Sequence, residues 1–310
     1  MDLNHLSVKD FSEIFGVSSE KISEDIKELI NKSNFSYYRL DFAGIKEVIL
    51  KILKRIDSPD LGIAGAQGKE RWVRGWQENL DNFIKSGYDI NELVPKFIRP
   101  NQPIRLFGDY VVPLNSEFEL NFYKIFRSWI FSEYLFGFDT IYEFGCGTGF
   151  NLVELAKLYP EKKLHGLEWV SPSVEILRLL REKCGYNITG HLFDMFSPDK
   201  NLEVTPTSAF LAIGALEQIG KNFEPFLEFV LEKRPAIFVH VDSITELYGE
   251  NNLSDYLALK HDIKRNYLQG YLTRLRELEK EGRVEIMKVQ KVSCGGLYHD
   301  GYSYIIWKPK

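Results

Sequence analysis

The 310-residue chain has little cysteine and methionine, three of each, and no long apolar run. Its cysteines, Cys146, Cys184 and Cys294, are odd in number and far apart, so neither a disulfide framework nor a zinc site is indicated. A membrane helix needs about 18 or more apolar residues, and the N-terminus lacks the basic and apolar segments of a secretory signal. These absences predict a soluble, cytoplasmic protein with no metal and no membrane partner.

The chain also lacks an excess of positive charge. Lys and Arg total 39 against 44 Asp and Glu, which gives a net charge of −5 at pH 7. Nucleic-acid-binding proteins concentrate Lys and Arg on one face, so we expect no nucleic-acid partner. The hydrophobic content of 44% is sufficient for a core. Because domains usually have ~100–200 residues, the length predicts one domain of the size of a catalytic domain, with an accessory region.

The first part of the chain, residues 1–135, is predicted to be a helical N-terminal region. Apolar residues recur there at helical spacing in several segments, namely 8–16, 19–32, 44–56, 69–87 and 117–136. Between the last two segments, residues 95–113 carry four prolines, which is incompatible with a helix. We expect a long loop with short extended pieces that covers a small-molecule pocket as a lid. Arg99 and Arg105 in this loop are candidates to pair with a phosphate or carboxylate.

Residues 136–310 show a different pattern, in which short apolar runs alternate with helical stretches. This alternation predicts an α/β domain with a doubly wound, mostly parallel seven-stranded sheet. The expected strands are Thr140–Phe144, Lys163–Glu168, Ile188–Phe193, Ser208–Ile213, Ala236–Val241, Val284–Val292 and Tyr302–Trp307.

A glycine-rich turn follows the first of these strands. Gly145, Gly147 and Gly149 permit positive φ angles and a close backbone approach, and the helix after them offers free N–H groups to an anionic ligand. The dinucleotide fingerprint G-x-G-x-x-G/A needs glycine or alanine at its last position. Phe150 occupies that position, which argues against a bound pyrophosphate.

The pattern that remains, an acid followed by G-x-G-x-G between a strand and a helix, resembles the first motif of class I S-adenosylmethionine-dependent methyltransferases. This resemblance implies a Rossmann-like fold and S-adenosyl-L-methionine as cofactor. Glu143 would face the amino-acid moiety, and Gly145, Gly147 and Gly149 would line its path.

The ends of the next two strands also resemble this family. Glu168 ends the second strand, where the family's acid binds the ribose hydroxyls, and Trp169 can pack on the adenosine. Asp194 ends the third strand, where the family's acid accepts from the adenine amino group, and Met195 would cover the ring. The resemblance extends over roughly residues 139–310.

The catalytic base is harder to assign, because the sequence departs from the family pattern. The acid often found at the head of the fourth strand is absent, and Gln218 replaces the histidine of the turn after it. His299, in the hairpin before the last strand, has a side chain suited to taking a proton from a hydroxyl. The other candidates are Asp242, Glu217 and His240.

The acceptor is expected to be a small molecule. Residues 238–248 and 271–309 resemble sugar O-methyltransferases of bacterial surface-polysaccharide pathways, which implies a sugar or nucleotide-sugar hydroxyl. An amine acceptor, and hence N-methylation, is the alternative reaction. The resemblance to this subfamily is weaker than the one that the cofactor motifs carry.

A function of another class is raised by residues 6–30, which resemble a helix-turn-helix with Gly16 in the turn and a second helix from Ser18 or Ser19. A transcriptional regulator or binding protein would use this segment. The second helix has a net charge of −2, which DNA phosphates would repel. We expect the N-terminal helices to cover the acceptor pocket or to form a homodimer.

Overall fold

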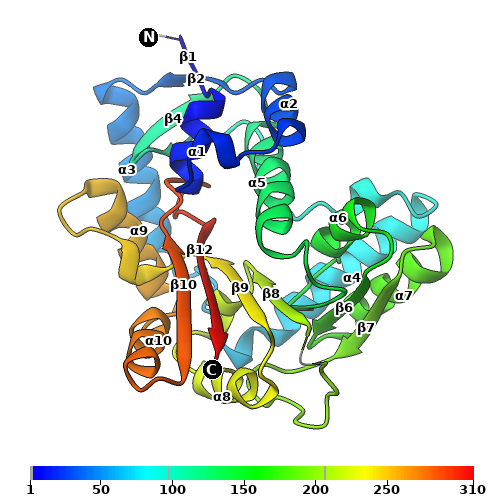
Figure 1. Cartoon of the computed structure of the whole chain (residues 1–310). Helices are drawn as coiled ribbons and strands as arrows, with labels where there is room; N and C mark the ends of the chain where they lie inside the picture. The colour runs from blue at the N-terminus through cyan, green and yellow to red at the C-terminus, as the bar shows by residue number, and fades with distance from the viewer. Residues whose placement is uncertain (1–2, 97, 206) are drawn as a thin grey trace.

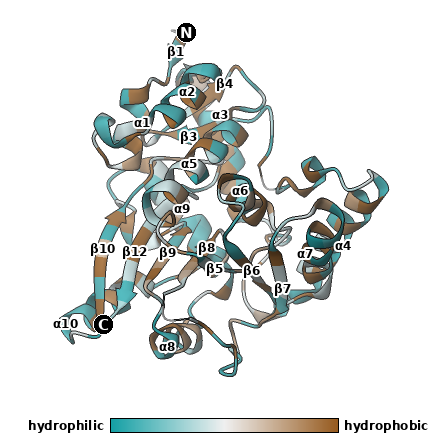
Figure 2. Ribbon diagram, turned by 45° about the vertical axis from the view of Figure 1, so that its right-hand side comes forward, coloured by the Kyte–Doolittle hydropathy of each residue, from teal (hydrophilic) through white to brown (hydrophobic). Residues whose placement is uncertain are grey.

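The computed structural model describes residues 3–96, 98–205 and 207–310. Its larger sheet has seven strands in the order β10-β12-β9-β8-β5-β6-β7, as the labels in Figure 2 also show. Their bounds are β5 Thr140–Phe144, β6 Lys163–Glu168, β7 Ile188–Leu192, β8 Ala209–Ile213, β9 Ile237–Asp242, β10 Val284–Gln290 and β12 Ser303–Pro309.

The strand directions confirm the predicted fold class. Strands β5 to β9 run parallel, and β12 lies antiparallel between β9 and β10. All seven predicted strands exist, with bounds that differ by two residues at most. Ligands of doubly wound sheets bind beyond the carboxyl ends of the parallel strands, and this edge is therefore the place to look for a site.

Helices cover both faces of the large sheet. Side chains alternate between the faces along β8, where Leu211 packs on one side and Phe210 and Ala212 on the other. The first face is covered by helices α5 (Phe118–Tyr134), α6 (Phe150–Leu158) and α7 (Ser171–Cys184), and the second by α8 (Glu224–Lys233) and α10 (Tyr271–Lys280).

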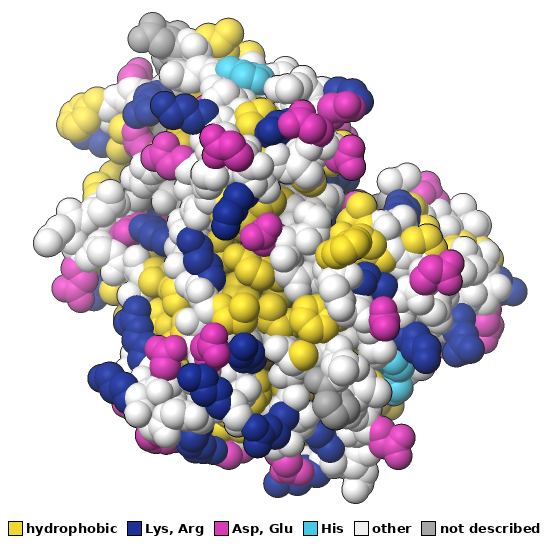
Figure 3. Space-filling model, in the orientation of Figure 1, with side chains coloured by type: hydrophobic (Ala, Val, Ile, Leu, Met, Phe, Trp, Pro, Cys, Tyr) yellow, Lys and Arg dark blue, Asp and Glu magenta, His cyan; other side chains and the backbone are white. Residues whose placement is uncertain are grey.

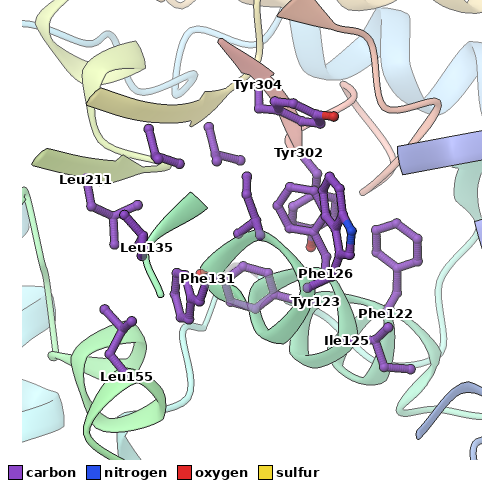
Figure 4. Close-up of a cluster of buried hydrophobic side chains, with 14 of the residues drawn as sticks. Phe122, Tyr123, Ile125, Phe126, Phe131, Leu135, Leu155, Leu211, Tyr302 and Tyr304 are labelled. Atoms are coloured by element: carbon purple, nitrogen blue, oxygen red, sulfur yellow. The ribbon is translucent and has the colours of Figure 1, made fainter. Parts of the chain in front are cut away.

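An aromatic cluster joins α5 to β12 in the core of the first face (Figure 4). Tyr302 lies 5.5 Å from both Phe122 and Tyr123, measured between ring centroids, and Phe126 lies 5.8 Å from it. Aromatic pairs at such separations contribute roughly 0.5–1.5 kcal/mol beyond the area they bury. The cluster therefore fixes α5, the last helix before β5, against the strand that ends the chain.

The N-terminal region contains the predicted helices and also a sheet that the sequence did not predict. The helices are α1 (Val8–Phe15), α2 (Glu24–Lys32), α3 (Phe42–Ile56) and α4 (Lys69–Lys85), with 3-10 turns η1 (Ser19–Lys21), η2 (Ala66–Gly68) and η3 (Ile90–Leu93). The antiparallel sheet has the order β1-β2-β4-β3-β11 and comprises β1 (Leu3–His5), β2 (Ser36–Arg39), β3 (Ile104–Leu106), β4 (Asp109–Pro113) and β11 (Cys294–Gly295). Strand β11 comes from the connection between β10 and β12, so the C-terminal region completes the N-terminal sheet.

The predicted lid loop needs correction in its second half. The extended pieces expected within residues 95–113 are β3 and β4, which lie in the interior of the small sheet rather than over a pocket. Arg105 is fully buried and forms ion pairs with Asp300 at 2.9 Å and Asp255 at 3.1 Å. It cannot reach a ligand, because its guanidinium group is already enclosed by these two carboxylates.

The helix-turn-helix prediction is also only partly correct. Gly16 adopts the left-handed conformation expected of the turn, but the second α-helix begins at Glu24, after η1, and not at Ser18 or Ser19. On α2, Lys27 and Lys32 are paired with Glu24 and Glu28. Lys, Arg, Asp and Glu side chains are also interspersed over the face of the molecule in Figure 3. These features do not favour DNA binding.

The remaining elements are α9 (Leu253–Lys264), η4 (Leu216–Ile219) and η5 (Thr245–Leu247). None of the helices within the described ranges is long and apolar enough to span a membrane. Helix α3 exposes Phe42 and Leu50, whose exposed fractions are 75% and 52%. A homodimer through the N-terminal helices stays a prediction.

We predict that Arg105→Met lowers the free energy of unfolding by about 3–5 kcal/mol, because it leaves the buried Asp300 carboxylate without its cation, whereas Asp255 keeps its ion pair with Lys291. Urea denaturation measures the change. Arg39→Met is the matched control, since the Arg39–Asp109 pair is exposed and such pairs contribute about 0–1 kcal/mol. Equal effects of the two substitutions would show that the buried ion pairs do not hold the two sheets together.

Candidate functional site

Two adjoining cavities lie at the carboxyl ends of the parallel strands. The first is narrow and is lined by residues of the turns after β5, β6, β7 and β8, namely Gly145, Glu168, Trp169, Phe193, Asp194, Met195, Phe196, Gly214, Ala215, Gln218 and Ile219, together with Trp72 and Trp76 of α4. The second has a volume of about 600 Å³. It shares Trp72, Trp76, Gly145, Gly214 and Gln218 with the first, so a ligand in one cavity can contact a ligand in the other.

Of the glycine turn, Gly145 lines both cavities and Gly147 lines the second, while Gly149 lines neither. Gly145, Gly147 and Gly149 have φ angles of 67°, 54° and 75°, which L side chains rarely adopt. A Cβ atom on Gly147 would lie 3.0 Å from the ring of Trp76, and one on Gly149 would lie 2.5 Å from Leu177. The turn therefore needs glycine both for its conformation and for the close approach of its neighbours.

Glu168 lies at the end of β6 with its carboxylate against this turn. Its Oε2 accepts a hydrogen bond from the Gly147 N–H at 3.2 Å, and its Oε1 accepts one from the Trp169 N–H at 2.8 Å. Burial raises the pKa of Glu168 to about 7, although both hydrogen bonds oppose the shift. The side chain lines the first cavity, where it can accept hydrogen bonds from a ligand.

The other predicted adenosine contacts line the same cavity. Trp169, Asp194 and Met195 are all half-buried there, and the Asp194 Oδ1 accepts a hydrogen bond from the Phe196 N–H at 2.8 Å. The ring of Phe196 lies 5.6 Å from that of Trp169. The structure thus brings together Glu168, Trp169, Asp194 and Met195 at one end of the glycine turn.

Glu143 lies behind the wall of the second cavity instead of lining it. The side chain is fully buried, and its Oε1 accepts a hydrogen bond from Asn151 Nδ2 at 2.7 Å. Burial raises the pKa of Glu143 to about 8, and its Oε2 has no hydrogen-bond partner. Because Asn151 lines the cavity, Glu143 can act on a ligand through Asn151.

A buried carboxylate and two histidines form a cluster at the second cavity. Asp262 of α9 is fully buried, and its Oδ1 lies 3.0 Å from His299 Nδ1 and 2.9 Å from His261 Nδ1. The hydroxyl of Ser243 donates to the Asp262 Oδ2 and lies 3.0 Å from the Tyr248 hydroxyl. Both histidines line the cavity. With its Nδ1 held by Asp262, His299 has its Nε2 available for a substrate proton.

The pKa values of His299 and Asp262 are shifted in the directions that favour the charged form of each group. Burial alone would lower the pKa of His299 and raise that of Asp262. The opposite charge of the partner outweighs burial in each case, so the pKa of His299 rises to about 9 and that of Asp262 falls. A free histidine has a pKa of about 6.5. The stabilisation from this pair is therefore fully present between pH ~4 and pH ~6.5. It is lost as the pH rises through about 9, because His299 loses its proton, and also in strong acid, because Asp262 gains one.

The same three side chains are the group that could hold a metal ion within the described part of the chain. His261, Asp262 and His299 each offer one ligand atom, and these atoms lie within 4.8 Å of one another. In the structure they are joined by hydrogen bonds. The sequence analysis expected no metal, and this stays a prediction.

Of the other candidate bases, the structure brings only Glu217 to the cavity. Glu217 lines it, and burial with the nearby Asp242 raises the pKa of Glu217 to about 7. His240 and Asp242 are fully buried and lie 2.9 Å apart, and Asp242 accepts a hydrogen bond from the Leu216 N–H at 3.1 Å. Neither lines either cavity, so the prediction of a catalytic role for these two residues is not supported.

Several residues that line the cavities were not predicted from the sequence. Trp72 and Trp76 lie one helical turn apart on α4, and their rings stack at 5.4 Å between centroids. Their i, i+4 spacing in the sequence could have indicated that they lie on the same face of a helix. Gln218 has a buried Oε1 with no hydrogen-bond partner, and so does the Oε2 of Glu119. Orphaned polar atoms beside a cavity are what a polar ligand would satisfy.

Comparisons with known proteins gave similar solved structures only. No family model and no curated protein matches the chain. It is similar to N,N-8-amino-8-demethyl-D-riboflavin dimethyltransferase from Streptomyces davawensis, with 12% identity, a TM-score of 0.46 and coverage of 98% of this chain and 89% of that one. It is also similar to the plantazolicin methyltransferase BpumL in complex with SAH, with 14% identity, a TM-score of 0.43 and coverage of 86% and 97%.

A third similar structure is human N-acetylserotonin methyltransferase in complex with SAM, with 15% identity, a TM-score of 0.43 and coverage of 61% of this chain and 55% of that one. At these identities and scores the similarity concerns only the general path of the chain. The geometry of the two cavities is thus what bears on function.

We predict that Asp262→Asn lowers the pKa of His299 from about 9 toward the ordinary value of about 6.5, because the amide removes the facing negative charge. An NMR titration of the histidine ring protons measures the shift. His165 is the internal reference, since burial and the nearby His191 lower its pKa to about 4 without any contribution from Asp262. An unshifted His299 would mean that the two side chains are not paired in solution.

Proposed function

We propose that the chain is an S-adenosylmethionine-dependent methyltransferase that transfers a methyl group to a hydroxyl of a small molecule, most specifically a sugar. The observation that carries this proposal is the convergence of the glycine turn, Glu168 and Asp194 on one cavity that opens into a second cavity containing the His299–Asp262 pair. This reaction needs an acid at a strand end and a glycine-rich turn to bind the cofactor, and a separate cavity to bind the acceptor.

The first cavity suits the nucleoside part of the cofactor. Glu168 would accept hydrogen bonds from the ribose hydroxyls, and Asp194 would accept one from the adenine amino group, with Met195 and Trp169 against the ring. The glycine turn and Asn151, which is held by Glu143, line the way into the second cavity, where the amino-acid end would lie. The orphaned Gln218 Oε1 between the cavities is a further acceptor for it.

S-adenosylmethionine supplies, when bound, a methyl group already activated by a sulfonium centre. The protein's own contribution is to hold the acceptor in line and to remove its proton. His299 would take that proton on Nε2, because its Nδ1 is held by Asp262. The buried carboxylate stabilises the imidazolium that forms, as in other histidine–aspartate pairs.

The acceptor cavity has a lining that suits a sugar. It combines aromatic faces, from Tyr267, Tyr298 and Tyr302, with polar groups such as Glu119 and Gln102. Its volume of about 600 Å³ falls within the usual ~300–1,000 Å³ of small-molecule sites. Aromatic faces can pack on pyranose rings, while the polar groups bind hydroxyls. An amine acceptor is the alternative outcome, and product analysis would distinguish the two.

We predict that S-adenosylmethionine and S-adenosylhomocysteine bind and that NAD does not, because Phe150 replaces the third glycine of a dinucleotide site. Glu168→Ala should weaken the binding of S-adenosylhomocysteine by ~1–3 kcal/mol through the loss of hydrogen bonds to the ribose. Titration calorimetry measures both effects, with the exposed Glu161→Ala as the control for the loss of one carboxylate. Binding of NAD alone would refute the proposal.

We predict that His299→Ala lowers turnover by ~10²–10⁴ and leaves the affinity for S-adenosylhomocysteine unchanged, because a general base acts in the transition state. In the unmodified protein, kcat/KM should rise with pH and level off above about 9, since His299 must lose its proton before it can accept another. His5→Ala, an exposed histidine, should have no effect. Full activity of the His299 variant would place the base elsewhere, with Glu217 as the next candidate.

A further inference from the structure

Three arginines line the second cavity without a carboxylate partner. Arg55 comes from the last turn of α3, Arg99 from the segment before β3, and Arg265 from the residue after α9. None of them forms an ion pair with any carboxylate of the residues that the structure describes. They come from three separate parts of the chain and line the same cavity.

The arginines that are fully buried elsewhere in the protein have carboxylate partners. Arg105 is held by Asp300 and Asp255, and Arg127 pairs with Glu154 at 3.4 Å. Partly enclosing a cation without a counter-charge costs free energy, because the cation loses hydration that nothing replaces. Arg55 and Arg265 are partly enclosed without the counter-charge that Arg105 and Arg127 have, and the exposed Arg99 lines the same cavity. An anionic ligand can supply this counter-charge.

Two contacts orient the side chain of Arg265, although its charge has no carboxylate partner among the described residues. Its Nε donates a hydrogen bond to the Gly62 carbonyl at 2.9 Å, and its guanidinium lies 4.5 Å from the ring centroid of Tyr267. Within the described residues, its two terminal nitrogens make no hydrogen bond. An arginine oriented in this way presents a preformed pair of donors, which matches the two oxygens of a carboxylate or phosphate.

The acids of the same cavity do little to neutralise these arginines. Burial raises the pKa of both Glu119 and Glu217 to about 7, so each carries only part of a negative charge near neutral pH. His299 and Asp262 form a charge pair that adds little net charge, so the three arginines remain the main charges of the cavity. The cavity is thus electropositive although the whole chain has a net charge of −5.

We propose that Arg55, Arg99 and Arg265 form an oxyanion subsite, which binds a phosphate or carboxylate group of the methyl acceptor. The inference rests on the proposed function, in that it takes the second cavity to be the acceptor site. The acceptor is then an anionic sugar, a phosphorylated or carboxylated one, and not a neutral sugar. Charge-assisted bonds to this group hold the acceptor while its hydroxyl lies near His299.

Calorimetry on the protein saturated with S-adenosylhomocysteine tests the subsite, with inorganic pyrophosphate and citrate as probes. We expect at least one of them to bind, and its Kd to rise about 10-fold or more in Arg55→Gln, Arg99→Gln and Arg265→Gln. Arg276→Gln is the matched control, because Arg276 is an exposed arginine of α10 outside the cavity. Arg99 is exposed on its loop, so its variant reports on binding even if Arg265→Gln fails to fold.

The outcomes separate the possible sources of the anion. Binding of pyrophosphate alone indicates a phosphorylated acceptor, binding of citrate alone a carboxylated one, and binding of both a general oxyanion site. Equal Kd values in all the variants and the control would overturn the proposal, as would the absence of binding by either probe. If the protein binds the anions but not S-adenosylhomocysteine, measured separately, the proposed function fails and the subsite stands.

Discussion

The buried guanidinium of Arg105 joins the two halves of the molecule. Its β-strand belongs to the N-terminal sheet, while its partners Asp300 and Asp255 belong to the C-terminal hairpin and to α9. The Asp300 N–H in turn donates to the Tyr248 hydroxyl, which lies 3.0 Å from Ser243, the residue that donates to Asp262. One polar network therefore runs from the small sheet to the carboxylate that orients His299.

This arrangement explains why the accessory region is part of the site. Trp72 and Trp76 of α4 form a wall common to both cavities, and Arg55 and Arg99 add charge to the second. The large sheet supplies the glycine turn and the strand-end acids, while α4, which packs beside α7 (Figure 1), brings its two tryptophans to the same cavities. In the proposed function, the turns of the sheet bind most of the cofactor, and the region before the sheet contributes to recognition of the acceptor.

The sequence predicted the large sheet well because buried parallel strands are short apolar runs between helices, as in Thr140–Phe144. It missed the small sheet because β11 has two residues and pairs with β3, far away in the chain. The role of Arg105 was mispredicted for the same reason, since its partners Asp255 and Asp300 are distant in sequence. Asp262 carries no local signal either, and only the tertiary fold brings it to His299.

The most direct test of the account is a crystal structure of the protein with S-adenosylhomocysteine bound. The account predicts the adenine beside Asp194 and Met195, the ribose hydroxyls on Glu168, and the sulfur at the opening into the cavity that contains His299. A nucleoside bound away from Glu168, or a sulfur separated from that cavity by the wall of Trp72 and Trp76, would contradict it.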